Sequence, residues 1–211
     1  WVWVHNCNAV VVDPSISTPV KEWLLNKNLS LQAILQTHHH EDHIGGTQDL
    51  IRRWPNAKVI ASKKELKRIP FQTFSVEDND TFYLLDSEIK VLEVHGHTNN
   101  HIAFYVSKEN ANYSILFPGD TLFGGGCGRL LEGTPTQMFE SLKKLNSLPE
   151  NTKVYSAHEY TENNLKWALS IKVNDICITE RLKNVQSKLK NGLTSLPSTI
   201  SEERRTNLFL R

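Results

Sequence analysis

The sequence predicts an α+β fold in which two mixed sheets pack face to face, with helices outside and a helical extension from about residue 161. In the first half of the chain, short apolar runs alternate with helix-like segments. From residue 81 onward, strands instead follow one another with short polar turns between them. A sandwich of this kind gathers loops at one edge, where ligands from distant strands can meet.

The expected elements follow in chain order. A β-branched run at 8–12 ends at the turn Asp13-Pro14, and Pro19 stands at the first position of the next helix. The first part is expected to hold strands at 8–12, 31–35 and 58–61 and helices at 18–25 and 46–54.

The second part is expected to begin as a β-meander that is antiparallel in part. Thr134-Pro135-Thr136-Gln137 is a capping box that predicts a helix through Leu145, and Asn191-Gly192 ends the last long helix. Strands are expected at 82–85, 89–94, 102–106, 114–117 and 153–156, and helices at 163–171 and 176–189.

Composition places the chain among ordinary globular proteins. Its 211 residues are 39% hydrophobic and 22% charged, and apolar runs stay well short of a membrane span. The net charge of +1 gives no reason to expect a nucleic-acid partner, and we expect neither membrane binding nor a stable oligomer. The chain starts without methionine and in the strand-like run Trp1-Val2-Trp3-Val4, so we expect residues to be missing before Trp1 or after Arg211.

Three widely spaced cysteines indicate a reducing compartment. Cys7, Cys127 and Cys177 form no CxxC pair and no disulfide framework, so we expect a cytoplasmic protein. Cys7 and Cys177 are expected in the core. Cys127, between glycines, could be taken for a nucleophile, but no base is placed beside it by sequence.

The most unusual stretch is Thr37-His38-His39-His40-Glu41-Asp42-His43, which is followed by two glycines. Imidazole is the commonest metal ligand in proteins, and carboxylates complement it. His38 and His40 lie two residues apart, so in an extended segment they point the same way. Asp42 and His43 follow on a turn and can face a second point. One loop could therefore supply ligands to two metal ions, whereas a merely polar surface loop would not need such regular flanks.

Three further candidate ligands each follow a predicted strand: His97, Asp120 and His158. Each alone is a weak indication, because a histidine after a strand is commonly a loop residue and an aspartate after glycine commonly bonds its own backbone. Their presence together in one chain with the histidine-rich loop supports a metal site at one sheet edge.

The set His38-x-His40-x-Asp42-His43 with His97, Asp120 and His158 resembles the metallo-β-lactamase superfamily of hydrolases. The segments 126–134 (GCGRLLEGT) and 157–161 (AHEYT) are similar to those of its glyoxalase II family, the hydroxyacylglutathione hydrolases. The resemblance covers essentially the whole chain, including residues 207–211. It implies a four-layer αββα sandwich over residues 1–160 and a C-terminal helical substrate-binding domain over residues 161–211.

The resemblance also implies a binuclear centre and a reaction. His38, His40 and His97 would hold one metal, Asp42, His43 and His158 the other, and Asp120 would bridge them together with a metal-bound hydroxide. Asp42 and Asp120 would be the catalytic carboxylates. The mixed N and O ligand set suits two divalent ions, zinc first, with iron or manganese also tolerated. The reaction would be hydrolysis of S-D-lactoylglutathione to glutathione and D-lactate, in methylglyoxal detoxification.

For substrate binding, the resemblance carries roles onto Arg129, Tyr160 and Arg211, since arginine captures carboxylates by bidentate bonds. Leu131 departs from an aromatic residue found in some family members, which puts one contact to glutathione in doubt. The glycine run 124–126 lacks the ending of a phosphate loop and is expected to let the backbone approach the metal edge.

Other functions remain open from the sequence. One is a different hydrolase on the same scaffold, such as a lactonase or a β-lactamase. Another is a persulfide dioxygenase, which resembles glyoxalase II and uses a single iron. A third is a non-catalytic metal-binding module, although structural zinc sites are closed and often rich in cysteine.

Overall fold

The structure is a computed structural model that describes residues 1–107 and 113–211. The chain forms two compact units. The first unit is Trp1–Glu93 with Asn100–Glu109, and the second is Val94–Asn99 with Asn110–Arg211. Each unit is described by itself below.

The first unit contains a five-stranded sheet in the order β1-β2-β3-β4-β5. β1 pairs antiparallel with β2, and the remaining neighbours pair parallel. Because β-branched and small apolar residues fill the central strands, they are buried on both faces, as parallel strands usually are. The strands are β1 (Val2–His5), β2 (Asn8–Val12), β3 (Ser30–Leu35), β4 (Lys58–Ser62) and β5 (Phe74–Val76).

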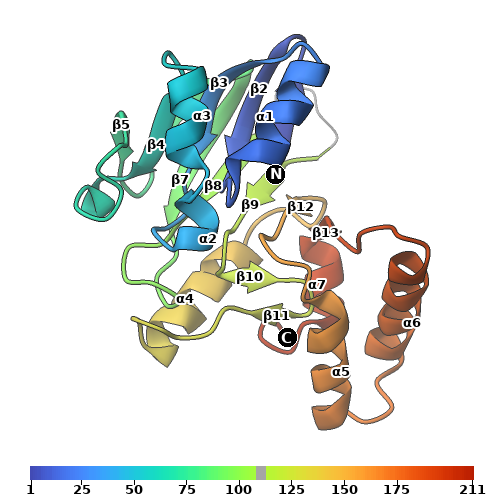
Figure 1. The fold of residues 1–211 in the computed structure, drawn as a ribbon. Coiled ribbons are helices and arrows are strands. Elements are labelled where there is room, and N and C mark those ends of the chain that lie inside the picture. Colours follow the sequence, from blue (N-terminus) through green and yellow to red (C-terminus); the bar gives the residue numbers. More distant parts are fainter. Residues whose placement is uncertain (108–112) are drawn as a thin grey trace. The chain divides into compact units, whose positions relative to one another are not determined.

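Two helices cover one side of this sheet, α1 (Ser17–Asn26) and α3 (Thr47–Arg53) (Figure 1). Leu24 of α1 and Leu50 of α3 are fully buried in one cluster with Ala9 and Val11 of β2 and Leu31 and Ile34 of β3. Each such leucine contributes about 1.5–3 kcal/mol by leaving water. The helix predicted at 46–54 thus begins and ends within one residue of the expected positions.

The same unit contains the antiparallel meander β6 (Thr81–Leu84), β7 (Ser87–Glu93) and β8 (Ile102–Ser107). Leu85 and Asp86 have positive φ and form the turn between β6 and β7, so the strand predicted to include Leu85 ends one residue earlier. Phe82 of β6 contacts Phe74 of β5 and Phe104 of β8, with ring centroids 5.8 and 6.5 Å apart. These aromatic contacts join the meander to the five-stranded sheet.

The second unit pairs β9 (Ile115–Phe117) parallel with β12 (Lys153–Val154), and β12 antiparallel with β13 (Ser198–Thr199). A separate hairpin is formed by β10 (Leu122–Phe123) and β11 (Gly126–Cys127). The capping box at Thr134 is present and begins α4 (Pro135–Asn146), as predicted.

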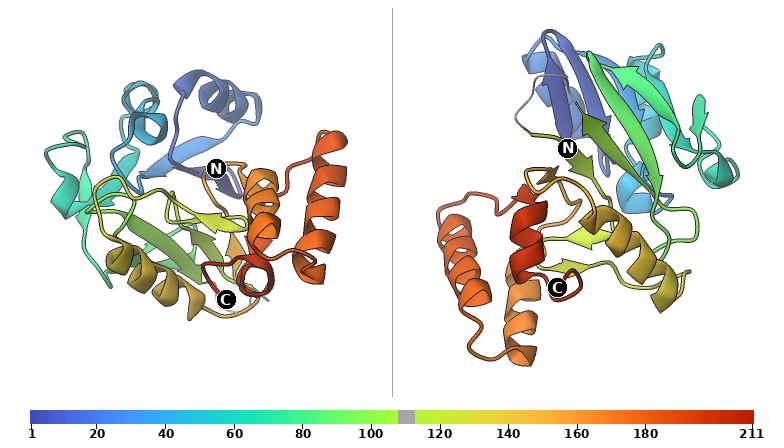
Figure 2. Two further views of the ribbon diagram at one scale, coloured as in Figure 1. Left: turned by 90° about the horizontal axis from the view of Figure 1, so that it is seen from below. Right: turned by 180° about the vertical axis from the view of Figure 1, so that it is seen from behind.

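The C-terminal part of the second unit is helical, with α5 (Thr161–Ile171), α6 (Ile176–Lys190) and α7 (Ile200–Thr206). α5 and α6 lie side by side (Figure 2) and bury a small cluster that includes Leu165, Ala168, Ile178 and Val185. Asp175 caps α6 by accepting the N–H of Ile178 at 3.0 Å. Within the described residues, no helix has the length and apolar character that a membrane span requires.

One prediction about the core is wrong. Cys7 and Cys177 were expected to be buried, and both are exposed. Cys7 follows the turn residue Asn6, whose φ is positive, and Cys177 lies in the first turn of α6. Residue type alone did not predict their position, because the face of the turn or helix on which a side chain lies decides whether it is buried: Ile178, next to Cys177, is fully buried.

Candidate metal centre

In the first unit, the histidine-rich loop runs from the end of β3 into the short helix α2 (Glu41–Ile44). Its first residue is fixed by Asp13, which follows the neighbouring strand β2. Thr37 donates its backbone N–H to Oδ1 of Asp13 at 2.9 Å and its hydroxyl to Oδ2 at 2.7 Å. Asp13 has a φ of 49°, a conformation that aspartate tolerates better than most residues. Two adjacent parallel strands therefore fix the position at which the ligand loop begins.

His38 and His40 point toward each other. Nε2 of His38 lies 2.9 Å from Nδ1 of His40. His38 is fully buried, and its Nδ1 lies 3.0 Å from the Thr37 hydroxyl. The ring of His101, just before β8, stacks on that of His38 with centroids 4.6 Å apart. The loop thus presents two imidazole nitrogens to one point.

Asp42 and His43 lie on α2, and the centroid of the His43 ring is 4.1 Å from that of His38. Nδ1 of His43 is 3.0 Å from Oδ2 of Asp13, and its Nε2 is 3.7 Å from Oδ2 of Asp42. Metal-binding histidines commonly have one ring nitrogen held by a carboxylate so that the other is aimed at the ion. His43 has this arrangement, with Asp13 as the orienting carboxylate.

Among the histidines and carboxylates of the loop, His39 and Glu41 are the two that belong to neither proposed ligand set. His39 lies against Glu65, with 3.5 Å between Nδ1 and Oε1, and its Nε2 is 3.2 Å from Arg68. Glu41 is exposed. The interaction of His39 with Glu65 and Arg68 attaches the loop to the segment after β4.

In the second unit, Asp120 lies between two imidazoles. Its Oδ2 is 3.5 Å from Nε2 of His97, and its Oδ1 is 3.4 Å from Nε2 of His158. Nδ1 of His97 lies 2.8 Å from the carbonyl oxygen of Arg129, which holds the ring by its other nitrogen. Asp120 therefore places one carboxylate oxygen near each of the two imidazoles.

The backbone explains why Asp120 and His158 come together. Asp120 follows β9 and His158 follows β12, and these two strands are parallel neighbours. The carboxyl ends of parallel strands meet at one edge of a sheet, so residues far apart in sequence become neighbours there. Gly128 fits between Asp120 and His97, because a Cβ at this position would lie 1.8 Å from the Asp120 carbonyl oxygen.

These residues suit a divalent metal. The described residues contain histidine and aspartate clusters typical of the binuclear site of metallo-β-lactamases. Neutral imidazole and carboxylate ligands together accept zinc, iron or manganese. Cys127 does not add a thiolate, because burial raises the pKa of its thiol to about 11 and keeps it protonated at neutral pH. The same shift argues against Cys127 as a nucleophile.

The residues predicted to bind substrate all lie in the second unit. Tyr160 stacks on the ring of His158 with centroids 5.0 Å apart and an interplanar angle of 14°. Arg211 donates to Asp175 at 2.7 Å. The Ile178 N–H, and then Arg211, lower the pKa of Asp175, so this pair persists at neutral pH and is lost only as the pH falls through that lowered pKa.

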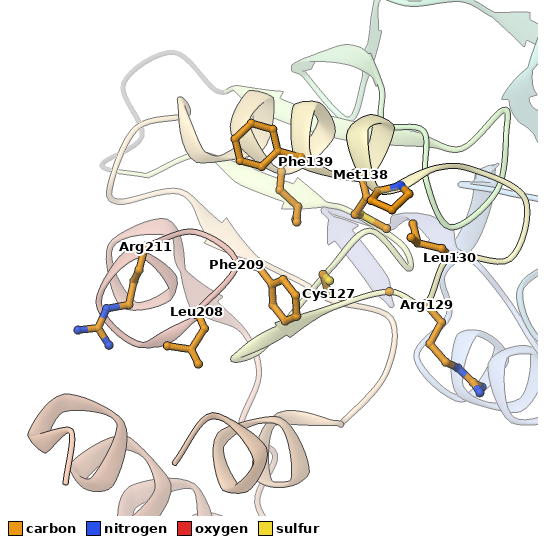
Figure 3. Close-up of a pocket in the computed structure, with 11 residues that line it drawn as sticks. Cys127, Arg129, Leu130, Met138, Phe139, Leu208, Phe209 and Arg211 are labelled. Atoms are coloured by element: carbon orange, nitrogen blue, oxygen red, sulfur yellow. The ribbon is translucent and has the colours of Figure 1, made fainter. Parts of the chain in front are cut away.

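Arg129 and Arg211 both line a pocket of about 590 Å³ (Figure 3). Met138 and Phe139 of α4 lie along one side and Phe209 along another, with the two arginines on opposite sides of Phe209. The remaining walls are mostly apolar: Leu130, Pro135, Leu142 and Leu208. Leu131, the departure from the aromatic residue, is exposed.

Two features, one in each unit, were not predicted from the sequence. Asp13 was interpreted only as a turn residue, although a carboxylate at the end of a strand beside β3 is a signal for a histidine partner. The glycines at 124–126 were expected to approach the metal edge, but they approach α5 instead. A Cβ at Gly124 would lie 2.4 Å from the Thr161 hydroxyl, and one at Gly126 would lie 2.6 Å from the Asn164 amide.

Comparison with known proteins gives two family matches. The model of the metallo-beta-lactamase superfamily matches residues 1–158, and that of the hydroxyacylglutathione hydrolase C-terminus matches residues 159–211. A hydroxyacylglutathione hydrolase of Prochlorococcus marinus (strain NATL1A) is 78% identical over 210 residues, covering 100% of this chain and 84% of the relative. Another, from Parasynechococcus marenigrum (strain WH8102), is 51% identical over 213 residues, covering 100% of this chain and 86% of the relative.

Solved structures support the same fold. The B3 metallo-beta-lactamase BLEG-1 has a TM-score of 0.73 at 23% identity, covering 99% of this chain and 92% of that one. ETHE1 from Myxococcus xanthus has a TM-score of 0.70 at 24% identity, covering 98% of this chain and 76% of that one. The predicted fold class is confirmed: a metallo-beta-lactamase fold with two mixed sheets and a C-terminal helical region. The chain belongs to the hydroxyacylglutathione hydrolase (glyoxalase II) family of the metallo-beta-lactamase superfamily.

Proposed function

We propose that the chain hydrolyses S-(2-hydroxyacyl)glutathione thioesters, with S-D-lactoylglutathione as the principal substrate and glutathione and D-lactate as products. The observation that carries this proposal is the 78% identity to a hydroxyacylglutathione hydrolase along the entire chain. Thioester hydrolysis also matches the side chains present: histidines and aspartates can bind the metals, and Arg129 and Arg211 can bind the glutathione carboxylates. Methylglyoxal detoxification is the process in which this substrate arises.

Seven residues from both units are proposed to form one binuclear centre. His38, His40 and His97 would hold the first metal, and Asp42, His43 and His158 the second, with Asp120 bridging. The support within the first unit is the close approach of His38 to His40 and the orientation of His43 by Asp13. The support within the second unit is the position of Asp120 between His97 and His158. Zinc is our first choice of metal.

Bound metals would supply a nucleophile at neutral pH by lowering the pKa of water to about 7 and would stabilise negative charge on the carbonyl oxygen. Asp42 and Asp120 would hold the metal ions in position, and Asp42 would also hold the proton of the attacking water. A thiol with a pKa of about 8.5 leaves readily, so the side chains need not include a strong general acid. This explains why the proposed site consists almost entirely of ligands.

Glutathione carries two carboxylates, and the proposed contacts are Arg129, Tyr160 and Arg211. Arg211 is held by Asp175 and lies beside the same pocket as Arg129. We propose that residues 161–211 form the substrate-binding domain beside a metal-binding domain of residues 1–160. We also propose that the protein is a cytoplasmic monomer.

The decisive assay measures hydrolysis of S-D-lactoylglutathione with and without a chelator, beside a lactone and a β-lactam at matched concentrations. We expect strong preference for the thioester, loss of activity with chelator, and recovery on adding zinc. Metal analysis of the active protein should give two ions per chain. Preference for the lactone or the β-lactam would contradict the substrate, and one ion at saturation would contradict the binuclear centre.

An oxygen electrode separates this proposal from the dioxygenase alternative. Glutathione persulfide should cause no oxygen uptake with either zinc- or iron-loaded protein. Uptake that depends on iron would instead favour oxygenation and overturn the proposed hydrolysis.

Replacing Arg129 tests the substrate contact. Arg129→Ala should raise KM for the glutathione thioester at least about 10-fold, the value of one charged hydrogen bond, while kcat changes little. Arg205→Ala, at another exposed arginine, is the control and should leave both constants unchanged. An effect of Arg129→Ala on kcat alone would contradict the assignment.

A further inference from the structure

A buried ion pair lies in the C-terminal part of the second unit. Glu203 of α7 is 0% exposed and accepts from Nη2 of Arg181 at 2.6 Å. Arg181 of α6 is 6% exposed, and its Nη1 donates to the Thr206 hydroxyl at 2.6 Å. Burying two charges costs several kcal/mol per ion before their attraction offsets it. Stability alone is therefore a weak reason for this pair.

The second oxygen of Glu203 bonds outside the helices. Oε2 accepts the backbone N–H of Gly125 at 2.8 Å and an amide N–H of Asn207 at 3.2 Å. Gly125 is at the tip of the β10–β11 hairpin and has a φ of +67°. The buried carboxylate of α7 thus holds the turn between β10 and β11.

Two more side chains of the same helical region hold this tip. Asn164 of α5 donates to the Gly124 carbonyl at 3.0 Å. Asn207 donates to the Gly126 carbonyl at 2.9 Å and to that of Phe123 at 3.3 Å. A hairpin with two residues in each strand is not stable alone, so its position depends on these bonds.

The two arms of the hairpin lead to the candidate ligands. Asp120 lies two residues before β10, and the N–H of Gly128, which follows β11, bonds the Thr121 carbonyl at 3.2 Å. The next carbonyl, of Arg129, lies 2.8 Å from Nδ1 of His97. Phe123 contacts the ring of His158 with centroids 5.9 Å apart. Moving the tip would therefore displace the surroundings of three proposed ligands.

We propose that Glu203, with its charge compensated by Arg181, is a positioning residue that fixes the β10–β11 hairpin and thereby aligns Asp120 and His97 for metal binding. This inference rests on the proposed function for its kinetic consequence. It assigns the C-terminal helical region a second task, the alignment of metal ligands in addition to substrate binding. Glu203 itself touches neither substrate nor metal in this proposal.

Glu203→Gln tests the proposal with little change of shape. The amide cannot accept from both Arg181 and Gly125, because one of its two ends is a donor. We expect zinc affinity, measured by competition with a chromophoric chelator, to fall at least about 10-fold, as for the loss of an outer partner of a ligand. Hydrogen exchange of the Gly125 amide should become faster. With zinc at saturation, kcat should also fall, and excess zinc should not restore it.

Arg204→Gln is the matched control on the same helix. Arg204 donates to the side chain and backbone of Asn146 and to Leu148 and Glu150, near the end of α4. It makes a network of similar size that does not include the hairpin. We expect this variant to lower Tm while zinc affinity, kcat and Gly125 exchange match the original protein.

Asn164→Ala keeps the proposal testable if Glu203→Gln does not fold. It removes one bond to the tip from a half-buried side chain and should shift zinc affinity and hairpin exchange in the same direction, by less. Folded variants with unchanged zinc affinity and unchanged exchange would overturn the proposal. If the original protein does not hydrolyse the thioester, the proposed function fails, whereas zinc affinity and exchange still decide the role of Glu203.

Discussion

The orientation of a single imidazole illustrates how the site is built at the residue scale. His43 has Asp13 at one ring nitrogen and Asp42 near the other. Asp13 also holds Thr37 at the start of the ligand loop, so one carboxylate fixes both a ligand and the backbone that carries two more. Asp13 belongs to neither proposed ligand set, yet the first unit depends on it for the loop geometry.

Asp13→Asn should therefore weaken zinc binding about 10- to 100-fold. Asparagine tolerates the positive φ of this position, so the backbone is preserved, while the amide removes the charge that orients His43. Titration with a competing chelator measures the change. Asp49→Asn on α3, which removes an exposed carboxylate paired with Arg52, should bind zinc as the original protein does. Equal affinities in the two variants would refute the role of Asp13.

Cysteine reactivity gives a second residue-scale prediction. Burial raises the pKa of Cys127 to about 11, so at pH 8 only about one thiol in a thousand is ionised, and the thiolate is the reactive form. Cys7 and Cys177 are exposed. Iodoacetamide at pH 8, followed by mass spectrometry of peptides, should label these two and leave Cys127 unlabelled until the protein is denatured. Labelling of Cys127 at the rate of Cys177 in folded protein would contradict its raised pKa.

At the scale of elements, two glycines show different reasons for the absence of a side chain: Gly128, just after the β10–β11 hairpin, and Gly192, just after α6. Gly128 stands where a Cβ would lie 1.8 Å from the Asp120 carbonyl oxygen, which no side-chain rotation can relieve. Gly192, which ends α6, has a φ of +71° but nothing within 4 Å of a Cβ. Glycine is therefore required at 128 because a side chain has no space there, and favoured at 192 only because the backbone is left-handed.

Gly128→Ala should destabilise the protein by more than about 3 kcal/mol, because the backbone on either side must move. Gly192→Ala should cost only about 1–2 kcal/mol, the penalty of a left-handed conformation for a residue with a Cβ. Urea unfolding monitored by tryptophan fluorescence gives both values. Similar costs for the two variants would show that the backbone near Asp120 adapts, contrary to its tight packing.

The same hairpin marks where prediction from sequence ends. The ligand candidates were predictable because each follows an apolar strand, and parallel strands such as β9 and β12 bring their ends together. The hairpin strands have two residues each, too few for any periodicity to show. Their position comes from Glu203, Asn207 and Asn164, which are distant in sequence and ordinary in local pattern. Contacts of this kind are set by tertiary packing and leave no local signal.

At the scale of the whole molecule, the proposed centre would draw His38, His40, Asp42 and His43 from the first unit and His97, Asp120 and His158 from the second. A metal bound by both sets would stabilise only the state in which both units are folded. Binding at 1,000 times Kd stabilises a native state by about 4 kcal/mol for each site. Metal binding and the cooperativity of unfolding are therefore expected to be linked.

Calorimetry with and without bound zinc checks this link. The zinc-loaded protein should unfold in a single transition, whereas the chelated protein should unfold at a lower temperature and over a broader range, as the two units lose their shared ligands. Restoring zinc should restore the single transition, which separates metal loss from irreversible damage. If chelation removes both ions and the transition keeps its temperature and width, the metals do not join the two units. The seven ligands would then have to be divided between independent sites, each contained within one unit.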